Sequence, residues 1–562
     1  METQIIGIDL GTTFSIVTTY ENRTSRVLEN TLGEALTPSV LAISKDGSTL
    51  VGRPAKERLL AAPESGIACF KRDMGTDRVY TLARQEWTPI ECASFVLREL
   101  KQVAEQALGE SVNQAVISVP AYFRDAQRQA TLKAAELAGL KVERLINEPT
   151  AAALAYGYQK PEEETNLLVF DLGGGTFDVT ILEVFDGVVE VKASAGESRL
   201  GGEDYTDLLS AYWIEKYHLT IAPELSAKWR KLVNQAKCNL SIRPEVTAEF
   251  EGQSLQISRN EFAEATQELN LRIKGVLKKC IYDSKLPASS IDKVLCVGGA
   301  SRMQIVHEII ESIFPGKMDD TVDPDEAIAI GAGVQAALVE LNEGVEDLVL
   351  TDVSPHTMGV MISKMRRGMN EKGFFSPIID RNTTLPVSRA EIYSTIHPDQ
   401  DEIDLQVYQG ESRFTKDNHL VGHLKVHGLK YTPNKDPHGG QVEVRFTYDM
   451  NGLLEVEVTI LSTQKVMSKV FEQRPGSLNA KEIKMALEKL KPMKIRPIDA
   501  LPNRYKLERA YALFEDLLGA ERAELETLVD QFEISLNEEN NDAILATGEL
   551  LERFMNKVSS RS

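Results

Sequence analysis

The sequence contains few cysteines. Five occur in 562 residues, and they are Cys69, Cys92, Cys238, Cys280 and Cys296. No two of them show the close spacing of a metal-binding or redox pair, and an odd number of widely separated cysteines gives no disulfide framework. We therefore expect reduced thiols that pack as small side chains.

The sequence also lacks a long apolar run. No stretch approaches the roughly 20 residues that span a bilayer. The short apolar run Ile5 to Leu10 has no basic segment before it, so no secretory signal is recognisable. These absences predict a cytoplasmic protein with no membrane partner.

Positive charge is in deficit, with 63 Lys and Arg against 84 Asp and Glu and a formal net charge of −21. Because binding to nucleic-acid phosphates needs clustered basic side chains, this balance argues against a nucleic acid as the main partner. The composition, 42% hydrophobic and 26% charged, is that of an ordinary globular protein. The length exceeds what one hydrophobic core usually supports and predicts about three to five domain-sized units.

The patterning divides the chain into four parts. In residues 1–342 short β-branched runs alternate with helical patterns, which is typical of α/β architecture. Residues 343–352 are a connector. In residues 353–476 short alternating runs lie between turn signals, among them a predicted hairpin with Asn451–Gly452 at its turn, so this part is predicted to be all β. Residues 477–562 carry amphipathic segments that predict a small helical bundle.

An internal repeat is the most informative feature. Gly7–Phe14 recurs as Val169–Asp178; in both segments an apolar strand ends in an Asp, and a turn of Gly and Thr leads into a second strand. Such a turn lets backbone N–H groups approach phosphate oxygens, and the hydroxyls add donors. A carboxylate near phosphates would be repelled unless a hard cation, most often Mg²⁺ with its waters, lies between them. Either segment alone is typical of a common hairpin, but Asp9 and Asp171 at equivalent places predict a phosphate and magnesium site.

Further glycine-rich segments support or limit this prediction. Gly298–Arg302 follows an apolar strand and precedes a helical run, so a helix N-terminus faces the turn. Asp323–Glu326 opens another helical run, where its acids suit the helix dipole. Inside that run Gly331, Gly333 and Ala336 match the dinucleotide fingerprint but do not follow a strand, so no dinucleotide site is assigned to them. No Gly-x-x-x-x-Gly-Lys-Ser/Thr motif occurs, which excludes a P-loop NTPase.

With these motifs the sequence resembles the seventy-kilodalton heat-shock chaperones, the DnaK family, and among bacterial forms the short, divergent HscC type. The matching segments are Ile8–Thr13, Val119–Phe123, Gln127–Thr131, Ile146–Ala153, Asp171–Asp178, Leu200–Asp204, Asp325–Ala327, Asn382–Thr384 and Gln409–Glu411. The resemblance implies a multidomain fold: an actin-like α/β nucleotide-binding domain, an all-β sandwich that binds extended peptides, and a short α-helical lid. ATP binding would loosen the grip on the peptide and hydrolysis would close it.

The resemblance also implies roles for individual residues. It implies that the catalytic residues are Lys71, Glu148, Asp178 and Thr176. It implies that ATP or ADP is held by Gly11, Thr12, Thr13, Gly173, Gly174, Gly175, Gly201, Gly202, Glu203, Lys237, Ser241, Gly298, Gly299, Arg302 and Asp325. Asp9 and Asp171 are implied to hold Mg²⁺ through water, and K⁺ is a further candidate ion. A positive charge at Lys71 would offset charge that develops on the transferred phosphoryl group.

Communication between the domains is implied for Pro120 and Arg128, which would sense the γ-phosphate, and for Leu348–Val349–Leu350 in the connector. An apolar tripeptide flanked by acids is unusual in a connector, because connectors are normally polar. Its pattern alone also fits a first strand of the β region, whereas the resemblance favours a linker that docks. The implied partners are unfolded or extended client peptides and a J-domain co-chaperone.

Two departures from the family pattern concern the base of the nucleotide. Where the family has a glutamate and an adenine-stacking arginine, this chain has Asn234 and Cys238. Losing one stacked cation and one hydrogen-bonding acid costs on the order of 1 to 3 kcal/mol of nucleotide affinity. We expect fast nucleotide release and little need for an exchange factor. Thr351 and His356 stand where the family has apolar residues, which indicates that the coupling between the nucleotide-binding and peptide-binding domains differs from that of the family.

The predicted peptide site rests on alignment with the family. Its cleft-lining candidates are Tyr393, Ile396, Ile403 and Leu405, and the alternative is that they are ordinary sandwich core. The segment Met361–Ser376 is longer than the family equivalent and carries Lys364, Arg366, Arg367 and Lys372. It is either a solvated loop without a role or a basic rim that favours peptides with acidic flanks.

Two other functions share the nucleotide-binding superfamily: a metabolic kinase and a filament-forming relative of actin. Neither explains an all-β region that follows an apolar connector and precedes a helical region. The sequence therefore favours an ATP-driven chaperone.

Overall fold

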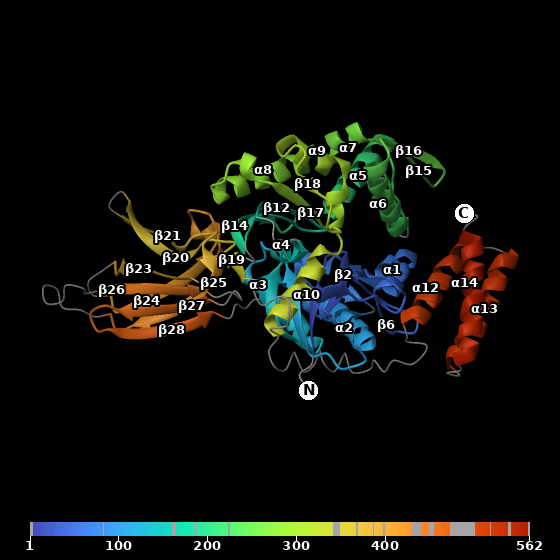
Figure 1. The fold of residues 1–562 in the computed structure, drawn as a ribbon, viewed down its shortest axis with the longest axis horizontal. Helices are drawn as coiled ribbons and strands as arrows, with labels where there is room; N and C mark the ends of the chain where they lie inside the picture. Colours follow the sequence, from blue (N-terminus) through green and yellow to red (C-terminus); the bar gives the residue numbers. More distant parts are fainter. Residues whose placement is uncertain are drawn as a thin grey trace.

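The computed structural model of the protein describes residues 4–559 apart from 83, 160–163, 186–187, 223–224, 341–348, 367–368, 386, 397–399, 430–439, 449–453, 472–500, 518 and 538–540. Figure 1 shows an α/β unit in the centre, with a β-sandwich on one side and C-terminal helices on the other. Separate hydrophobic clusters fill the α/β halves, the sandwich and the helices. This arrangement agrees with the predicted multidomain fold.

The first half of the α/β unit is built on a sheet in the order β11-β10-β1-β2-β3, with β4 paired to β2. Its strands are β1 (Ile5–Asp9), β2 (Phe14–Glu21), β3 (Thr24–Val27), β4 (Thr37–Pro38), β10 (Gln114–Val119) and β11 (Lys141–Asn147). β1 pairs parallel with β10 and antiparallel with β2. β1 is buried along its whole length, as its unbroken apolar run predicts for a central strand.

The second half repeats this order as β18-β17-β12-β13-β14. Its strands are β12 (Thr165–Leu172), β13 (Phe177–Phe185), β14 (Val188–Glu197), β17 (Lys293–Val297) and β18 (Met318–Asp319). β12 pairs parallel with β17 and antiparallel with β13, exactly as β1 does with β10 and β2. The repeat seen in two short motifs therefore extends to the topology of both sheets.

Two helices, α4 (Glu148–Gln159) and α10 (Ala327–Glu340), pack against each other between the two sheets and share a core with both. The glycines of the apparent dinucleotide fingerprint allow this packing. A Cβ on Gly331 would lie 1.8 Å from the carbonyl oxygen of Ala151, and one on Gly333 would lie 2.2 Å from Ser25 Oγ. Helix packing therefore explains why these two positions are glycine.

The remaining elements of the α/β unit surround these sheets. In the first half they are β5 (Val40–Ile43), β6 (Thr49–Val51), α1 (Arg53–Ala61), β7 (Gly66–Ala68), β8 (Tyr80–Leu82), β9 (Gln85–Trp87), α2 (Pro89–Leu108) and α3 (Asp125–Leu137). In the second half they are α5 (Gly202–Tyr217), α6 (Ser226–Ile242), β15 (Glu245–Phe250), β16 (Gln253–Ser258), α7 (Arg259–Ala265), α8 (Gln267–Ser284) and α9 (Gln304–Ile313). Local signals set the ends of α2, where Thr88 and Glu91 form a capping box and Gly109 follows with φ +72°.

The β-sandwich consists of two four-stranded sheets, β21-β20-β24-β25 and β23-β26-β27-β28. Its strands are β20 (Met358–Arg366), β21 (Met369–Ile379), β23 (Val387–Ser394), β24 (Glu402–Gln409), β25 (His419–His427), β26 (Gln441–Tyr448), β27 (Leu454–Ile460) and β28 (Lys465–Phe471). Alternate residues of β26 and β27 are buried, which is the pattern of strands with one face on a core. β26 and β27 pair as the predicted hairpin, while the Asn451–Gly452 turn lies outside the described residues.

The connector becomes part of the α/β unit. β19 (Val349–Val353) adds to the edge of the second sheet by pairing parallel with β14, and β22 (Thr384–Leu385) of the next domain pairs with β19. The segment is therefore a strand, and it docks on the second half of the α/β unit instead of on the sandwich core. Leu348 lies outside the described residues, and of Val349 and Leu350 only the backbone is described.

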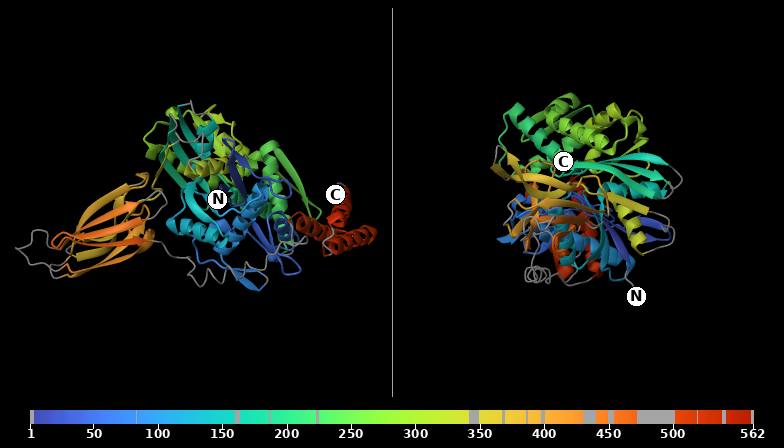
Figure 2. Two further views of the ribbon diagram at one scale, coloured as in Figure 1. Left: turned by 60° about the horizontal axis from the view of Figure 1, so that its bottom comes forward. Right: turned by 90° about the vertical axis from the view of Figure 1, so that its left-hand side faces the viewer.

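The C-terminal helices are α12 (Leu501–Asp516), α13 (Gly519–Asn537) and α14 (Asn541–Ser559). α12 packs on α1: Arg504 donates a hydrogen bond of 2.6 Å to Ser48 Oγ, and Lys45 Nζ lies 5.3 Å from the Tyr511 ring centroid. The helices and the sandwich consequently lie at opposite ends of the α/β unit, as Figure 1 and the left view of Figure 2 show. Among the helices that the structure describes, none is long and apolar enough to cross a membrane.

Candidate functional site

The two repeated turns face each other between the halves of the α/β unit. A Cβ on Gly174 would lie 2.1 Å from Thr13 Oγ1, and one on Gly175 would lie 2.9 Å from Thr12 Cγ2. Glycine is therefore required for the close approach of the second turn to the first. Backbone and hydroxyl donors of both predicted phosphate turns are brought to one place.

A third segment joins these turns. Gly202 N–H donates to Gly173 O over 2.9 Å, and Glu203 N–H donates to Gly174 O over 2.8 Å. A Cβ on Gly201 would lie 2.5 Å from the backbone nitrogen of Gly175. Because α5 begins at Gly202, a helix N-terminus points at the same place and favours negative charge there.

Four buried carboxylates line the space next to the turns: Asp9, Asp171, Asp178 and Glu148. Asp9 ends β1 and Glu148 begins α4, whereas Asp171 and Asp178 lie one residue inside β12 and β13 and are opposite each other in the ladder. Asp9 accepts a hydrogen bond of 2.7 Å from Ser118 Oγ, and Asp178 accepts one of 3.3 Å from the backbone N–H of Tyr122. Asp171 Oδ2 has no hydrogen-bond partner within the described part of the chain.

Burial perturbs these acids. Desolvation, followed by repulsion from Glu148, raises the pKa of Asp9 to about 6 and that of Asp178 to about 8. The same causes raise the pKa of Asp171 well above its usual range, and Asp178 and Asp9 add to the repulsion. Buried acids at such close range need positive charge to remain ionised at neutral pH.

Lys71 supplies one such charge. It lies in the 3₁₀ turn Phe70–Asp73, is 4% exposed, and its Nζ is 2.5 Å from Glu148 Oε1. This ion pair joins the 3₁₀ turn Phe70–Asp73 to the first residue of α4. One ammonium does not balance four carboxylates, so the arrangement, with the unpartnered Oδ2 of Asp171, fits a bound divalent cation.

Gly298 brings the last predicted turn to the acids. Its φ is +78°, and a Cβ there would lie 2.6 Å from Leu172 O and 2.9 Å from Asp171 Oδ1. Next to it, a Cβ on Gly299 would lie 3.7 Å from Asp325 Oδ1. Arg302 pairs with Asp325 and Asp323 over 2.7 and 3.1 Å. The predicted residues of this turn are therefore assembled at the edge of the site.

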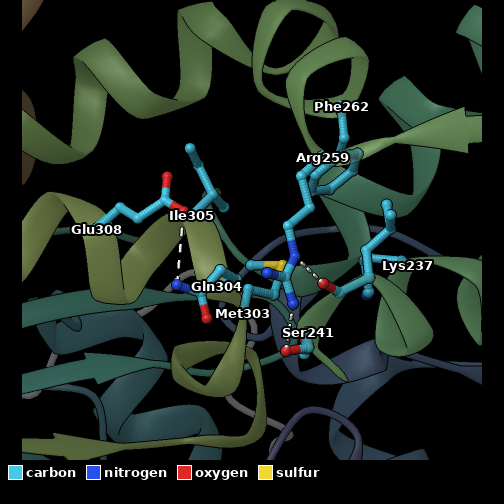
Figure 3. A pocket seen from close by; sticks show the side chains of 9 residues that line it. Lys237, Ser241, Arg259, Phe262, Met303, Gln304, Ile305 and Glu308 are labelled. Carbon is cyan, nitrogen blue, oxygen red and sulfur yellow. Dashed lines mark hydrogen bonds between the residues drawn. The ribbon is translucent and has the colours of Figure 1, made fainter. Parts of the chain in front are cut away.

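A pocket beside α6 lies where the base of a nucleotide is expected, and Figure 3 shows its lining side chains. Lys237 and Ser241 line it, and Lys237 Nζ donates to Gly202 O over 2.7 Å, which ties the pocket to the phosphate turns. Burial lowers the pKa of this lysine. Arg259 also lines the pocket and donates to the carbonyl oxygens of Leu240 and Ser241 over 2.8 and 3.0 Å. Cys238 is exposed on the same helix.

A chain of polar contacts leads from the site to the connector. The buried Arg128 side chain donates to Asn147 Oδ1 over 2.6 Å and to Ala121 O, next to Pro120, over 3.2 Å. Asn147 precedes Glu148 and donates from Nδ2 to Asp352 in β19. Burial raises the pKa of Asp352. The connector strand therefore contacts the residue adjacent to one of the candidate catalytic acids.

A second contact between the domains runs through Tyr122. Its backbone N–H bonds Asp178, and its carbonyl oxygen lies 3.3 Å from Nε2 of His356, whose ring packs edge-on to the Tyr122 ring at 4.3 Å. His356 is 5% exposed, and burial lowers its pKa to about 4, so it is neutral at neutral pH. Arg381 adds an ion pair to Asp283 of α8 over 2.8 Å. The sandwich is thus held against the α/β unit at several points.

The four predicted peptide-binding residues have different environments. Leu405 is a buried member of the sandwich core, which agrees with the alternative of ordinary core for this residue. Tyr393 and Ile403 are partly buried at the border of that core, and Ile396 is 40% exposed. The basic segment is not a loop: β20 and β21 pair as a hairpin as far as Arg366 and Met369, while Arg367 lies outside the described residues.

Several residues of the site were not predicted from the sequence. Ser118, Tyr122, Asn147, Asp352 and Arg259 make their contacts with segments far away in the chain, as when Ser118 bonds Asp9. Three of them stand close to predicted residues: Asn147 precedes Glu148, and Ser118 and Tyr122 each lie two positions from Pro120. Tyr122 and Asn147 also lie within the matching segments Val119–Phe123 and Ile146–Ala153, and these positions are the local signals for them.

Comparison with known proteins gives a consistent result. The family described as Hsp70 protein matches residues 5–85 and 78–558 of this chain. Chaperone protein DnaK of Thermotoga neapolitana is 37% identical over 564 residues, covering 95% of this chain and 93% of that protein. Chaperone protein DnaK of Thermosipho africanus is 36% identical over 584 residues, covering 99% and 96%. The chain belongs to the Hsp70 family of ATP-dependent chaperones, and like that family it is an ATPase.

Proposed function

We propose that this chain drives a chaperone cycle by hydrolysing ATP between the two repeated turns. The observation that carries the proposal is the buried Lys71–Glu148 pair next to Asp178, placed where the turns of both halves meet. A nucleotide with its phosphates on the turns has a lysine and several carboxylates at its reactive end. This placement suits attack by a water on the terminal phosphate.

Each group of residues has a defined role in this proposal. The phosphates bind to the turns of Gly11–Thr13 and Gly173–Thr176 and to the start of α5 at Gly201–Glu203. Glu148 and Asp178 orient the attacking water or accept its proton. Thr176, in the turn Gly173–Thr176, assists hydrolysis, and Lys71 offsets the charge that develops on the transferred phosphoryl group. The base occupies the pocket beside Lys237 and Ser241, flanked by Gly298–Arg302, with Asp325 near the phosphates.

Asp9 and Asp171 are the residues that would hold Mg²⁺, through its waters. When bound, the ion supplies positive charge that neutralises the phosphate oxygens. Two observations support a magnesium site here: burial raises the pKa values of Asp9 and Asp171, and Oδ2 of Asp171 has no hydrogen-bond partner within the described residues. K⁺ remains a further candidate ion.

Coupling to the peptide site is proposed to run through β19. Pro120 and Arg128 sense the occupied site, and Asn147 passes the change to Asp352, so strand β19 docks or leaves according to the nucleotide. The connector residues Val349 and Leu350 take part through this strand, and Leu348, which lies outside the described residues, is proposed to act with them. Four parts move relative to one another in this proposal: the ATPase domain (1–342), the linker (343–352), the sandwich (353–476) and the helical lid (477–562).

The proposed clients are extended apolar segments of unfolded proteins in the cytoplasm, held in the sandwich near Tyr393, Ile396 and Ile403. A J-domain co-chaperone is the proposed partner that stimulates hydrolysis. An exchange factor is not required if Asn234 and Cys238 make nucleotide release fast. Assignment to the HscC type remains a prediction.

A steady-state ATPase assay of the full chain tests this function. Adding an apolar heptapeptide together with a J-domain protein should raise turnover at least several-fold over the basal rate. A metabolic kinase of the same superfamily would instead transfer phosphate to a small metabolite, and a filament-forming relative would sediment with ATP. Either of those results, without stimulation by peptide, would contradict the chaperone assignment.

A further inference from the structure

The hairpin of β20 and β21 projects from the sandwich as a two-stranded ribbon (Figure 1). Its ladder runs from the pair Met358 and Ile379 to the pair Arg366 and Met369, whereas β24 pairs only with residues 358–360 of β20. The outer part is consequently exposed: Met365 is 68% and Met369 66% accessible to solvent. A ribbon of this kind needs its own side-chain contacts to hold a fixed shape.

Those contacts centre on one aromatic ring. Phe374 of β21 is 3% exposed and packs against Phe414, with ring centroids 5.6 Å apart. Lys364 Nζ lies 5.6 Å from the Phe374 centroid, and the guanidinium carbons of Arg366 and Arg413 lie 5.1 and 6.0 Å from it. Three exposed cations are therefore gathered over a buried ring, and stacking on the ring positions them in advance of any ligand.

The cations are available for a ligand. Within the described part of the chain, no ion pair involves Lys364, Arg366 or Arg413. Glu371 stands opposite Lys364 in the ladder without forming one. The segment 361–376 holds four basic residues against this one acid, in a chain whose net charge is −21. The ribbon is a local positive surface on a negative molecule, and its field selects for negative charge.

The surface borders the proposed peptide site. The hydroxyl of Tyr393, one of the peptide-binding candidates, donates a hydrogen bond of 3.2 Å to Ser376 Oγ of β21. Ser376 and Phe374 are two residues apart on this strand, about 7 Å along it. An extended client that passes Tyr393 therefore reaches the stacked cations within a few residues.

We propose that the three cations Lys364, Arg366 and Arg413 bind acidic side chains that flank the apolar segment of a client peptide. This inference rests on the proposed chaperone function and adds its substrate class. Lys364 and Arg366 lie two residues apart on one face of a strand, about 7 Å from each other, which matches acidic residues at alternate positions of an extended peptide. A nucleic acid fits less well, because the rest of the chain repels a long polyanion.

The test compares two labelled peptides that share an apolar heptapeptide and differ in their flanks, Glu-Ser-Glu or Lys-Ser-Lys at both ends. Fluorescence anisotropy with the full chain should show about three- to tenfold tighter binding of the acidic peptide, as expected for two or three exposed ion pairs. Added salt should reduce that preference. Equal affinities would overturn the inference, whereas failure of both peptides to bind would overturn the chaperone function itself.

A charge reversal gives a second, independent result. In the double variant Lys364→Glu with Arg366→Glu the preference should invert toward the basic peptide, and in Lys364→Gln with Arg366→Gln it should disappear. Lys425→Glu is the matched control, because Lys425 is exposed on β25 of the same domain, away from Phe374. Circular dichroism checks that each variant is folded. An unchanged preference in folded double variants would overturn the inference.

Discussion

At the scale of single residues, the site combines side chains that the sequence could predict with others that it could not. The acids Asp9 and Asp171 end apolar strands in a repeated motif, so periodicity and repetition were enough to find them. Tyr122 and Arg259 have no such pattern, because their contacts are with other segments of the chain. The Tyr122 N–H donates to the Asp178 carboxylate, and the Arg259 guanidinium donates to the carbonyl oxygens of Leu240 and Ser241. A sequence states which residues are neighbours along the chain, whereas these roles depend on neighbours in space.

Replacing Lys71 by Ala should reduce ATP turnover by about 100-fold or more, since preorganised charge at the reacting group is a large part of such catalysis. ATP binding should change little, because the turns and the base pocket remain. Single-turnover hydrolysis and equilibrium binding separate the two effects. Arg78→Ala, which removes an exposed cation of a nearby loop, is the control. Near-normal turnover in Lys71→Ala would remove this lysine from the catalytic set.

The exposed thiol of Cys238 permits a test of nucleotide release. Cys238→Arg restores a cation beside the base pocket and should slow ADP dissociation about five- to thirtyfold, as one stacked cation contributes about 1 to 2 kcal/mol. Cys238→Ala adds no cation and should release ADP at the wild-type rate. Stopped-flow fluorescence with a labelled nucleotide measures both rates. Slow release by the wild-type chain would contradict the proposed independence from an exchange factor.

At the scale of elements, the hydrophobic pattern predicted whether a segment forms a helix or a strand better than it predicted which other element packs against it. The periodic segments Asn503–Leu518, Ala520–Leu536 and Asp542–Val558 predicted helices, and α12, α13 and α14 lie within a few residues of these bounds. A fourth predicted segment, Ala480–Leu490, lies outside the described residues. That α12 packs on α1 was not predictable, since an apolar helix face does not specify the surface that covers it. For the connector the pattern alone fitted a first strand of the β region, whereas the resemblance favoured a linker that docks. β19 is a strand, but it pairs with β14 of the α/β unit and belongs to neither sheet of the sandwich.

The contact between β19 and Asn147 gives a prediction at this scale. Asp352→Ala removes the acceptor of the Asn147 side chain and should weaken docking of β19 on β14. ATP would then no longer lower the affinity for peptide. The coupling free energy between the two sites, about 1 to 3 kcal/mol in a typical allosteric protein, would be lost. Peptide binding measured with ATP and with ADP checks this. Asp417→Ala, at an exposed acid of the same sandwich, should keep the difference, and a full ATP effect in Asp352→Ala would exclude this route.

At the scale of the whole molecule, the helices and the sandwich lie on opposite ends of the α/β unit. A peptide site in the sandwich is therefore not covered by α12–α14 in this arrangement (Figure 2). Closing the helices over the sandwich requires that α12 leave α1. If the proposed cycle closes the helices over the sandwich, release of α12 from the first half of the unit is one step of that change.

The acidity of Glu508 makes this interface sensitive to pH. Burial raises the pKa of Glu508 to about 7, with Arg58, Arg504 and Lys45 opposing the shift and Asp46 adding to it. A carboxyl with a raised pKa in the docked state binds a proton on docking. Docking is therefore strongest below the ordinary pKa of Glu and weakens as the pH rises to about 7 and beyond.

Glu508→Gln should remove this dependence, with tighter docking at pH 8 and little change at pH 5. For the wild type, the equilibrium constant for docking of α12 should fall at least about tenfold between pH 5 and pH 8, because one pKa unit corresponds to 1.36 kcal/mol. Energy transfer between dyes on α2 and α13 measures docking. Glu524→Gln, at an exposed acid of α13, should behave as the wild type. A flat profile for the wild type would contradict the role of Glu508.

The parallel pairing of β19 with β14 has a consequence for solubility. If the connector leaves, β14 becomes an open edge of the remaining sheet β18-β17-β12-β13-β14, with unpaired backbone groups that can recruit another chain. Lys192 of β14, paired with Glu183 and Glu190, places charge along that edge. Charged side chains of this kind oppose the addition of a foreign strand. In the proposed cycle the connector thus also covers this edge, and its departure would briefly expose the chaperone to the kind of association that its clients must avoid.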